Sequence, residues 1–340
     1  MKIAIIGATG KGLTVAAYLQ KIYPDVTILD VPMEPLEQIQ SRGVTIYSST
    51  TFLTNFVVKP IEACASDYDF VFLFAHPFYN KNILPILKST LQQRCFIVSF
   101  QENLSDWELI QSFQNFPVLS AVCKFETYVK QHHQVVVTSP HTSLNQVAFD
   151  LYDSHPSYFY YAEEVKSVLD TIGCTQIVRT AFDIKWTQAI FSGAIDRLAS
   201  ALNCLYGDIL HHPIALQSSI HLVDEIVRIA KKYNITLAKT SELDYAALMI
   251  DSDTKKTEMM PIIEKLLLLY QKIPSNQDAY LIDELLEVAS LVDQPTPYLE
   301  TLAHCLHEKN EEDFHKNIAF FQPLGTGTLW RQELKKSEIR

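Results

Sequence analysis

Three of the chain's nine glycines, Gly7, Gly10 and Gly12, lie within six residues of one another near its start. They follow a short apolar run, residues 3–6, and precede a segment, residues 13–22, whose apolar residues recur at helical spacing. The pattern predicts a buried strand, a tight turn and a helix. The first amides of such a helix are free to bind a diphosphate, and glycine lets the backbone approach it closely. The turn therefore predicts a phosphate-binding site.

The turn also matches most of the dinucleotide-binding pattern G-x-G-x-x-G. Gly7 and Gly12 take the first and third glycine positions, with a strand before them and a helix after them. Thr9 takes the second position, where the backbone comes closest to the pyrophosphate, and Gly10 beside it can relieve this crowding. Lys11 lies in the same turn, within reach of a phosphate. We assign these five residues to cofactor binding.

An acidic residue, Asp30, ends the next apolar run, residues 26–29. A carboxylate at that position accepts hydrogen bonds from the adenosine ribose and repels a 2′-phosphate. No arginine follows it, since Val31 and Pro32 come next. We therefore expect NAD as the cofactor, with NADP as the alternative because Lys11 can meet the added phosphate. The competing interpretation is a tight turn without a ligand, in which Asp30 caps the segment that follows.

Short apolar runs alternate with amphipathic segments through the first half of the chain. The predicted strands are residues 3–6, 26–29, 70–74, 95–99, 118–122 and 135–138, the last at an edge, and the predicted helices are residues 13–22, 35–42, 80–91 and 104–113. This alternation is typical of a parallel sheet covered on both faces. From about residue 158 helical periodicity dominates, with one strand-like run at 175–178.

We therefore expect an α/β Rossmann-type doubly wound sheet followed by an all-α C-terminal domain. The expected boundaries are residues 1–178 for the dinucleotide-binding domain, 179–325 for a helical substrate and dimerisation domain, and 326–340 for a C-terminal tail. The predicted helices of the second half are residues 159–172, 182–205, 213–233, 239–251, 257–273, 278–291 and 297–308.

Composition excludes several classes of partner. The chain has 28 basic and 39 acidic residues, a net charge of −11, whereas a duplex nucleic-acid binder needs a basic surface. Its apolar stretches are far shorter than the roughly 20 residues that span a bilayer. Its six cysteines are scattered and no signal peptide precedes the first strand, so we expect a cytoplasmic protein. His304 and Glu308 share a helical face, but a solvated polar face explains them better than a metal site does.

Longer segments resemble the ketopantoate reductase (2-dehydropantoate 2-reductase) family, namely residues 36–46, 69–87, 97–110 and 161–213. In the last segment Trp186, Gly207 and the pair His212-Pro213 fall in register with the family's pattern. The resemblance implies that the second domain is helical and of the 6-phosphogluconate dehydrogenase C-terminal type. It implies further that the protein uses a nicotinamide cofactor. It also implies reduction of an α-keto acid in the cleft between the domains.

The positions that carry the family's chemistry hold other residues. The family's proton-donating lysine, two residues after the tryptophan, corresponds to Gln188, and two substrate-contacting asparagines correspond to Ser192 and Asp196. Glutamine donates a hydrogen bond but cannot transfer a proton at neutral pH, and losing such an acid costs about 10² to 10⁴ in rate. We therefore expect a substrate other than ketopantoate.

Further departures lie in the first domain and late in the second. The family's Asn-Gly pair near the nicotinamide corresponds to Glu102-Asn103, and the lysine expected after the 70–74 run corresponds to His76. The glutamate that binds the substrate hydroxyl falls near Asp278. The resemblance thus places His76, Glu102 and Asn103 at the cofactor and Asp278 at the substrate.

Two residues near Gln188 can supply the missing chemistry. Lys185, three residues earlier, is either a replacement proton donor or a solvated lysine near the helix start. Asp196 lies among apolar residues and needs a partner if it is buried. Arg197 is adjacent in sequence, but on a helix we expect it to point elsewhere.

The sequence thus predicts an NAD(P)-dependent reductase of an α-keto acid or a related carbonyl or imine, with a small-molecule substrate and a homodimeric state. The alternative is a catalytically inactive dinucleotide-binding sensor or interaction protein of the same fold. An opine-type dehydrogenase, which condenses an amino acid with a keto acid, is a third hypothesis.

Overall fold

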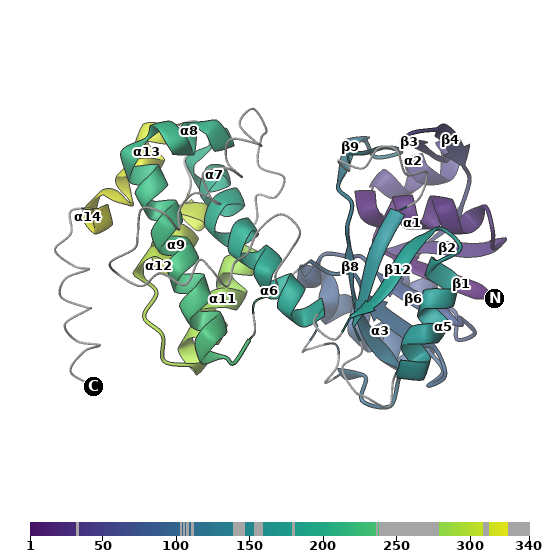
Figure 1. Cartoon of the computed structure of the whole chain (residues 1–340). Coiled ribbons are helices and arrows are strands. Elements are labelled where there is room, and N and C mark those ends of the chain that lie inside the picture. Colours follow the sequence, from purple (N-terminus) through teal and green to yellow (C-terminus); the bar gives the residue numbers. More distant parts are fainter. Residues whose placement is uncertain are drawn as a thin grey trace. The chain divides into compact units, whose positions relative to one another are not determined.

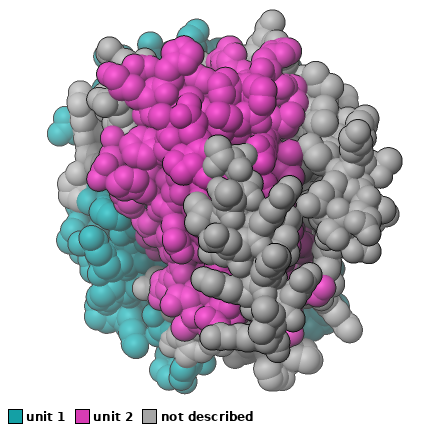
Figure 2. Space-filling model, turned by 90° about the vertical axis from the view of Figure 1, so that its left-hand side faces the viewer, with its two compact units in different colours: residues 1–182 teal, residues 183–340 magenta. Residues whose placement is uncertain are grey.

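A computed structural model describes residues 1–31, 34–102, 104, 106, 109, 112–138, 147–152, 159–178, 181–235, 237, 279–308 and 313–325. The chain divides into two compact units, residues 1–182 and 183–340 (Figures 1 and 2), where the sequence placed the boundary between residues 178 and 179. Asn103, Asp278, the predicted helices 239–251 and 257–273 and the tail 326–340 lie outside the described residues. Each unit is described by itself.

An eight-stranded sheet forms the centre of the first unit, in the order β12-β11-β8-β7-β6-β1-β2-β5. Neighbours from β5 to β8 pair in parallel, whereas β11 runs antiparallel to β8 and parallel to β12. The strands are β1 (Lys2–Ile6), β2 (Asp25–Asp30), β5 (Val57–Pro60), β6 (Phe70–Leu73), β7 (Phe96–Ser99), β8 (Val118–Cys123), β11 (Val147–Tyr152) and β12 (Gly173–Val178). Because β2 and β6 flank β1, the strand order reverses beside β1.

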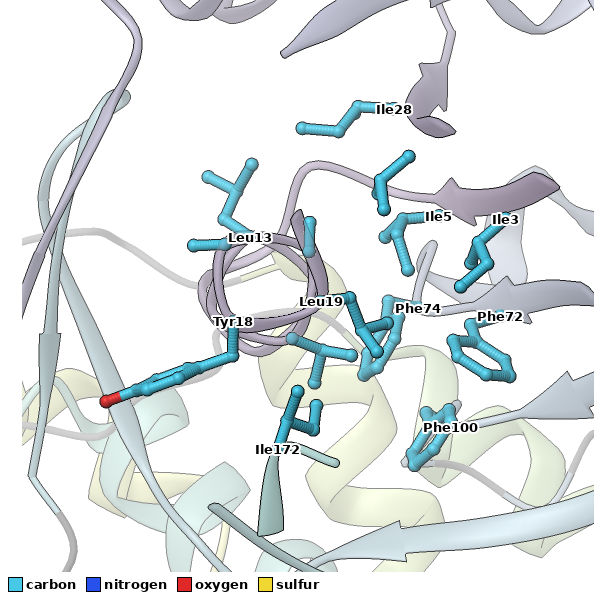
Figure 3. Packing of buried hydrophobic residues seen from close by; sticks show 14 of the residues in the cluster. Ile3, Ile5, Leu13, Tyr18, Leu19, Ile28, Phe72, Phe74, Phe100 and Ile172 are labelled. Atoms are coloured by element: carbon cyan, nitrogen blue, oxygen red, sulfur yellow. The ribbon is translucent and has the colours of Figure 1, made fainter. Parts of the chain in front are cut away.

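Alternation along β1 explains why helices cover both faces of this sheet. Ile3 and Ile5 pack with α1 (Gly10–Gln20), α2 (Glu34–Arg42) and α5 (Phe159–Leu169), and Ala4 and Ile6 pack on the opposite face with α3 (Asn80–Thr90). Figure 3 shows α1 end-on, with side chains of β1 and β6 against it. Short 3-10 turns, η1 (Ile61–Ala63) and η2 (Pro77–Tyr79), precede β6 and α3. The predicted doubly wound sheet is confirmed.

A second, four-stranded sheet in this unit has the order β4-β3-β10-β9. Its strands are β3 (Val44–Tyr47), β4 (Thr51–Thr54), β9 (Thr127–Gln131) and β10 (Gln134–Val137). β10 pairs in parallel with β3 and antiparallel with β9, so the prediction that residues 135–138 form an edge strand is wrong. Its partner β3 alternates buried and partly buried residues, and its partner β9 exposes most of its side chains, so neither strand stands out as a long apolar run.

The described elements of the second unit are all helical. They are α6 (Ala181–Phe191), a π-helical turn (Ser192–Asp196), α7 (Arg197–Leu202), α8 (Tyr206–His211), α9 (Pro213–Lys232), α11 (Tyr280–Leu291), α12 (Pro297–Glu308), α13 (Phe314–Ala319) and α14 (Gln322–Gly325). The predicted helix 182–205 therefore contains a π turn, and it ends where Asn203 adopts a left-handed conformation, φ 52°. No helix among the described residues has the length and apolarity needed to cross a membrane.

Candidate functional site

The candidate site lies where the parallel strands end. The glycine turn follows β1, Asp30 ends β2, and the segments that carry His76 and Glu102 follow β6 and β7. The carboxyl ends of parallel strands meet at one edge of a sheet. In doubly wound sheets ligands bind at that edge, where the strand order reverses. The fold therefore brings those predicted cofactor residues of the first unit that the structure describes to the edge where a dinucleotide would bind.

The glycines of the turn are required by close approach of backbone and side chains. Gly7 has φ +102°, and a Cβ there would lie 2.3 Å from the amide nitrogen of Ala75. A Cβ on Gly12 would lie 2.4 Å from the carbonyl oxygen of Gly7. At Gly10 the obstacle is different, because a Cβ would lie 2.5 Å from Thr127 Oγ1 on β9. Gly10 thus accommodates the second sheet, a requirement that the sequence did not reveal.

Thr9 organises the start of α1 as its N-cap. Its hydroxyl accepts a hydrogen bond from Gly12 N at 3.1 Å, and its carbonyl accepts one from Leu13 N at 2.8 Å. Within the described part of the chain, the amides of Gly10 and Lys11 donate no hydrogen bond. Two adjacent amides at a helix N-terminus, reinforced by the macrodipole, suit an oxyanion of a diphosphate.

Asp30 ties the glycine turn to the end of β2. Its Oδ2 accepts a hydrogen bond from Ala8 N at 2.7 Å, and its Oδ1 accepts one from Val31 N at 2.8 Å. Burial raises the pKa of Asp30, against the opposing effect of these two amide donors. Each carboxylate oxygen retains a second lone pair for a ribose hydroxyl. The capping of Val31 and a ribose contact are therefore compatible at this residue.

Lys11 forms ion pairs with two glutamates from distant parts of the chain. Its ammonium contacts Glu102, after β7, and lies 3.2 Å from Glu126 Oε2, after β8. The lysine side chain is only 15% exposed, and although burial alone would lower its pKa, the two carboxylates raise the pKa of Lys11 above its ordinary value. Glu126 was missed from the sequence, although, like Glu102, it follows a predicted strand at the same edge.

His76 caps the 3-10 turn that follows β6. Its Nδ1 accepts a hydrogen bond from Phe78 N at 3.2 Å, which assigns the ring proton of the neutral imidazole to Nε2. The ring is half-buried. The backbone therefore fixes the orientation of His76 at the edge of the sheet.

Four predicted catalytic residues of the second unit lie on α6 and the π turn. Lys185 is 1% exposed, Gln188 is exposed, Ser192 is half-buried and Asp196 is 4% exposed. The interpretation of Lys185 as a solvated lysine is therefore wrong, because its side chain is buried. π turns interrupt α-helices frequently at functional sites, which draws attention to this stretch.

Asp196 has the partners that its burial requires. It accepts a hydrogen bond from the Tyr206 hydroxyl, and Arg197 Nη1 lies 3.3 Å from its Oδ2. The same nitrogen donates to Ser192 Oγ at 3.2 Å. The expectation that Arg197 points away from Asp196 is wrong, because the long side chain folds back along the π turn. Among the described residues, no group of three or more His, Cys, Asp or Glu side chains could hold a metal ion.

Comparison with known proteins agrees with this architecture. Residues 3–146 match the family model described as ketopantoate reductase PanE/ApbA, and residues 181–310 match that of its C-terminal part. None of the curated protein sequences matches the chain significantly.

Several solved structures share the fold at low sequence identity. A ternary complex of D-mandelate dehydrogenase with NADH and anilino(oxo)acetate is 16% identical, with a TM-score of 0.71 over 90% of this chain and 97% of that one. A ketopantoate reductase family protein from Ralstonia eutropha JMP134 is 14% identical, with a TM-score of 0.73 over the same shares. The 2-dehydropantoate 2-reductase of Geobacter metallireducens GS-15 is 18% identical, with a TM-score of 0.68 over 91% of this chain and 99% of that one.

Proposed function

Because this chain belongs to the ketopantoate reductase family, we propose that it binds a nicotinamide dinucleotide at the glycine turn and reduces an α-keto acid or a related carbonyl or imine. The observation that carries the proposal is the pair of unbonded amides at Gly10 and Lys11, at the edge where the strand order reverses. A glycine turn alone is weak support, whereas the turn, its place in the sheet and the family together favour one ligand class.

The residues of the first unit fit the parts of such a cofactor. The two amides and the Lys11 ammonium bind the diphosphate, and Asp30 accepts hydrogen bonds from the adenosine ribose. A partly buried carboxylate followed in sequence by no arginine disfavours a 2′-phosphate, so NAD is the proposed cofactor and NADP the alternative. The similar D-mandelate dehydrogenase was solved with NADH. When bound, the cofactor supplies the hydride.

The reaction also needs a proton for the developing alkoxide or amine. Gln188 is exposed and suits a hydrogen bond to the substrate, with Ser192 one turn further along the same helix. Asp196 is held by Tyr206 and Arg197. Among the four predicted catalytic side chains of this unit, Lys185 is the remaining one whose chemistry suits a general acid. We therefore assign Lys185 as the proton donor. We also propose that the substrate is a compound other than ketopantoate.

The alternative function is a catalytically inactive dinucleotide sensor of the same fold. The glutamine at position 188 and the burial of Lys185 favour it, because neither side chain delivers a proton readily from its present position. For either function we propose a cytoplasmic homodimer, a state that light scattering would check.

One experiment separates these functions. The purified protein is mixed with NADH or NADPH, and nicotinamide absorbance is followed with a panel of α-keto acids, each with and without amino acids. Turnover on a keto acid supports the reductase, and turnover only with both reactants identifies an opine-type dehydrogenase. Binding without turnover supports the sensor, and failure to bind either cofactor overturns all three.

The substitution Gln188→Lys tests the departure from the family. Since Gln188 is exposed, a lysine fits there without overpacking. Ketopantoate reduction should rise by about 10² to 10⁴ if the rest of the family geometry is intact. Gln188→Met is the matched control, and it should not raise ketopantoate reduction, because methionine supplies no proton.

A further inference from the structure

Two buried carboxamides form a closed pair beneath the candidate site. Gln101 follows β7 and Asn80 begins α3, and each is 2% exposed. Gln101 Nε2 donates to Asn80 Oδ1 at 2.9 Å, and Asn80 Nδ2 donates to Gln101 Oε1 at 3.3 Å. Gln101 Nε2 also donates to the carbonyl oxygen of Ala75 at 2.7 Å. The amide of one glutamine side chain thus bonds both the loop after β6 and the first residue of α3.

These bonds connect three strand ends. Ala75 precedes His76, and its amide donates to Ile6 O, at the end of β1, at 2.8 Å. It also lies directly against Gly7, as the 2.3 Å approach of a Cβ to its nitrogen shows. Gln101 therefore links the end of β7 to that of β6, and through Ala75 to the glycine turn.

The end of β7 is also held from its other side. Asp106 is 2% exposed and accepts hydrogen bonds from Ser99 Oγ at 2.6 Å and from Ser120 Oγ on β8. The rings of Phe74 and Phe100 stack nearby with centroids 4.5 Å apart and an angle of 7° between their planes (Figure 3). Satisfied polar networks in a low-dielectric interior rigidify the segments that they join. Gln101 consequently has a fixed place from which to hold the neighbouring loop.

We propose that Gln101 is a positioning residue that sets the separation of the loops carrying His76 and Glu102, and thereby the seat of the nicotinamide ring. This inference rests on the proposed dinucleotide function. A doubly wound sheet binds one mononucleotide half on each side of the reversal in strand order. Asp30 on β2 marks the adenosine half, so the nicotinamide half falls over β6 and β7, the strand ends that Gln101 joins.

A role at the nicotinamide half alone should leave binding of the adenosine half unchanged. Two ligands distinguish these halves. ADP-ribose contains the adenosine and the diphosphate but lacks nicotinamide, whereas NADH contains all three and its fluorescence reports the environment of the nicotinamide. Gln101→Met keeps side-chain volume and removes every hydrogen bond of the carboxamide. Affinities for both compounds are measured by calorimetry, and the emission of bound NADH is recorded.

We expect Gln101→Met to bind ADP-ribose as the wild type does, because the bonds that hold the glycine turn, from Ala75 N to Ile6 O and from Ala8 N to Asp30, do not involve the Gln101 side chain. Its affinity for NADH should fall about tenfold, which corresponds to about 1.4 kcal/mol, because the loops that seat the nicotinamide lose the bond that fixes their separation. The emission change on NADH binding should be lost. Asn80→Ala leaves the Gln101–Ala75 bond in place, so it should also weaken NADH binding but not ADP-ribose binding, by a smaller factor. It replaces Gln101→Met in the test if that variant does not fold.

Leu87→Ala is the matched control. Leu87 is fully buried in α3 outside the amide pair, so its truncation should lower the melting temperature without changing the NADH to ADP-ribose affinity ratio. Equal weakening of both ligands in Gln101→Met, or no weakening of either, overturns the positioning role alone. A wild-type protein that binds neither ligand overturns the proposed function and the positioning role together.

Discussion

Gly12 faces the carbonyl oxygen of Gly7 so closely that a Cβ at position 12 would lie 2.4 Å from it. The first turn of α1 thus rests on the backbone that ends β1. Backbone cannot rotate away as a side chain can, so any residue larger than glycine must push the helix off the strand. The positions of the Gly10 and Lys11 amides depend on this contact.

Substitution of the two helical glycines should therefore have unequal effects. Gly12→Ala should destabilise the fold by about 1–3 kcal/mol and weaken NADH binding, because overpacking displaces the start of α1. Gly10→Ala is the matched comparison. Its nearest neighbours are side-chain atoms of Thr127 and Val129, which can rotate, so its effect should be smaller. Urea unfolding and NADH titration of both variants measure this, and equal losses would contradict the assignment.

The ion pairs of Lys11 predict opposite effects for lysine and glutamate variants. Glu102→Gln removes one of two carboxylates near the proposed diphosphate site, so NADH should bind a few times more tightly. Lys11→Met should weaken binding and reduce its dependence on salt, because a cation facing the phosphates is lost. NADH titrations at low and high ionic strength check both. Glu62→Gln, on η1, is the control, and weaker binding by Glu102→Gln would instead make that carboxylate a ligand of the cofactor.

Asp196 and Arg197 form a buried ion pair, and replacing only one of the two residues should lower the free energy of unfolding substantially. Arg197→Met leaves the carboxylate without its cation and should destabilise the protein by about 3–5 kcal/mol, since an uncompensated buried charge remains. Tyr206→Phe, which removes one hydrogen bond to the same carboxylate, should cost about 1 kcal/mol. In the double variant Asp196→Asn, Arg197→Met the loss should be less than the sum of the single losses. Additive losses in denaturant unfolding would show that the two charges do not interact.

Glu225 predicts how stability changes with pH. Its carboxylate, on α9, accepts hydrogen bonds from Tyr298 N at 2.9 Å and Leu299 N at 2.8 Å, at the start of α12. Burial raises its pKa from 4.5 to about 8, against the effect of those donors. The folded state therefore holds this proton more tightly than the unfolded state. The stabilisation is complete below pH 4.5 and is lost as the pH rises to about 8.

The measurement is the free energy of unfolding of wild type and Glu225→Gln across that range. Glu225→Gln removes the titrating group, so the wild type should lose stability relative to it as the pH rises, by up to about 1.4 kcal/mol for each pH unit. Parallel pH curves for the two proteins would exclude Glu225 as the source.

Local patterns predicted the elements whose residues bury one face. Apolar spacing placed the strand, turn and helix around Gly7, and Pro297, suited to the first turn of a helix, marked the start of α12. The second sheet was not predicted because β3 and β10 pair across about 90 residues, and because β9 exposes most of its side chains. No short-range period encodes such a pairing.

The candidate site was predictable where a backbone requirement selects the residue, as at Gly7 and Gly12. The site was not predictable where a long side chain contacts partners from segments that are distant in sequence. Lys11 reaches Glu126, and Gln101 reaches Ala75, only because the fold brings separate strand ends to one edge. Arg197 bonds Ser192 because the helix between them has a π turn, which an α-helical wheel does not represent.

The π turn at Ser192–Asp196 marks the place where this helix can lose one residue without changing the direction of the side chains that follow. Because it holds one residue more than an α turn, α7 is rotated by about 100° from where a continuous helix would place it. Deletion of a single amino acid from this stretch would convert the π turn into a regular α-helical turn. Every side chain downstream, beginning with Arg197, would then keep the direction that it has now, whereas a deletion elsewhere in the helix would turn those side chains by about 100° away from their neighbours.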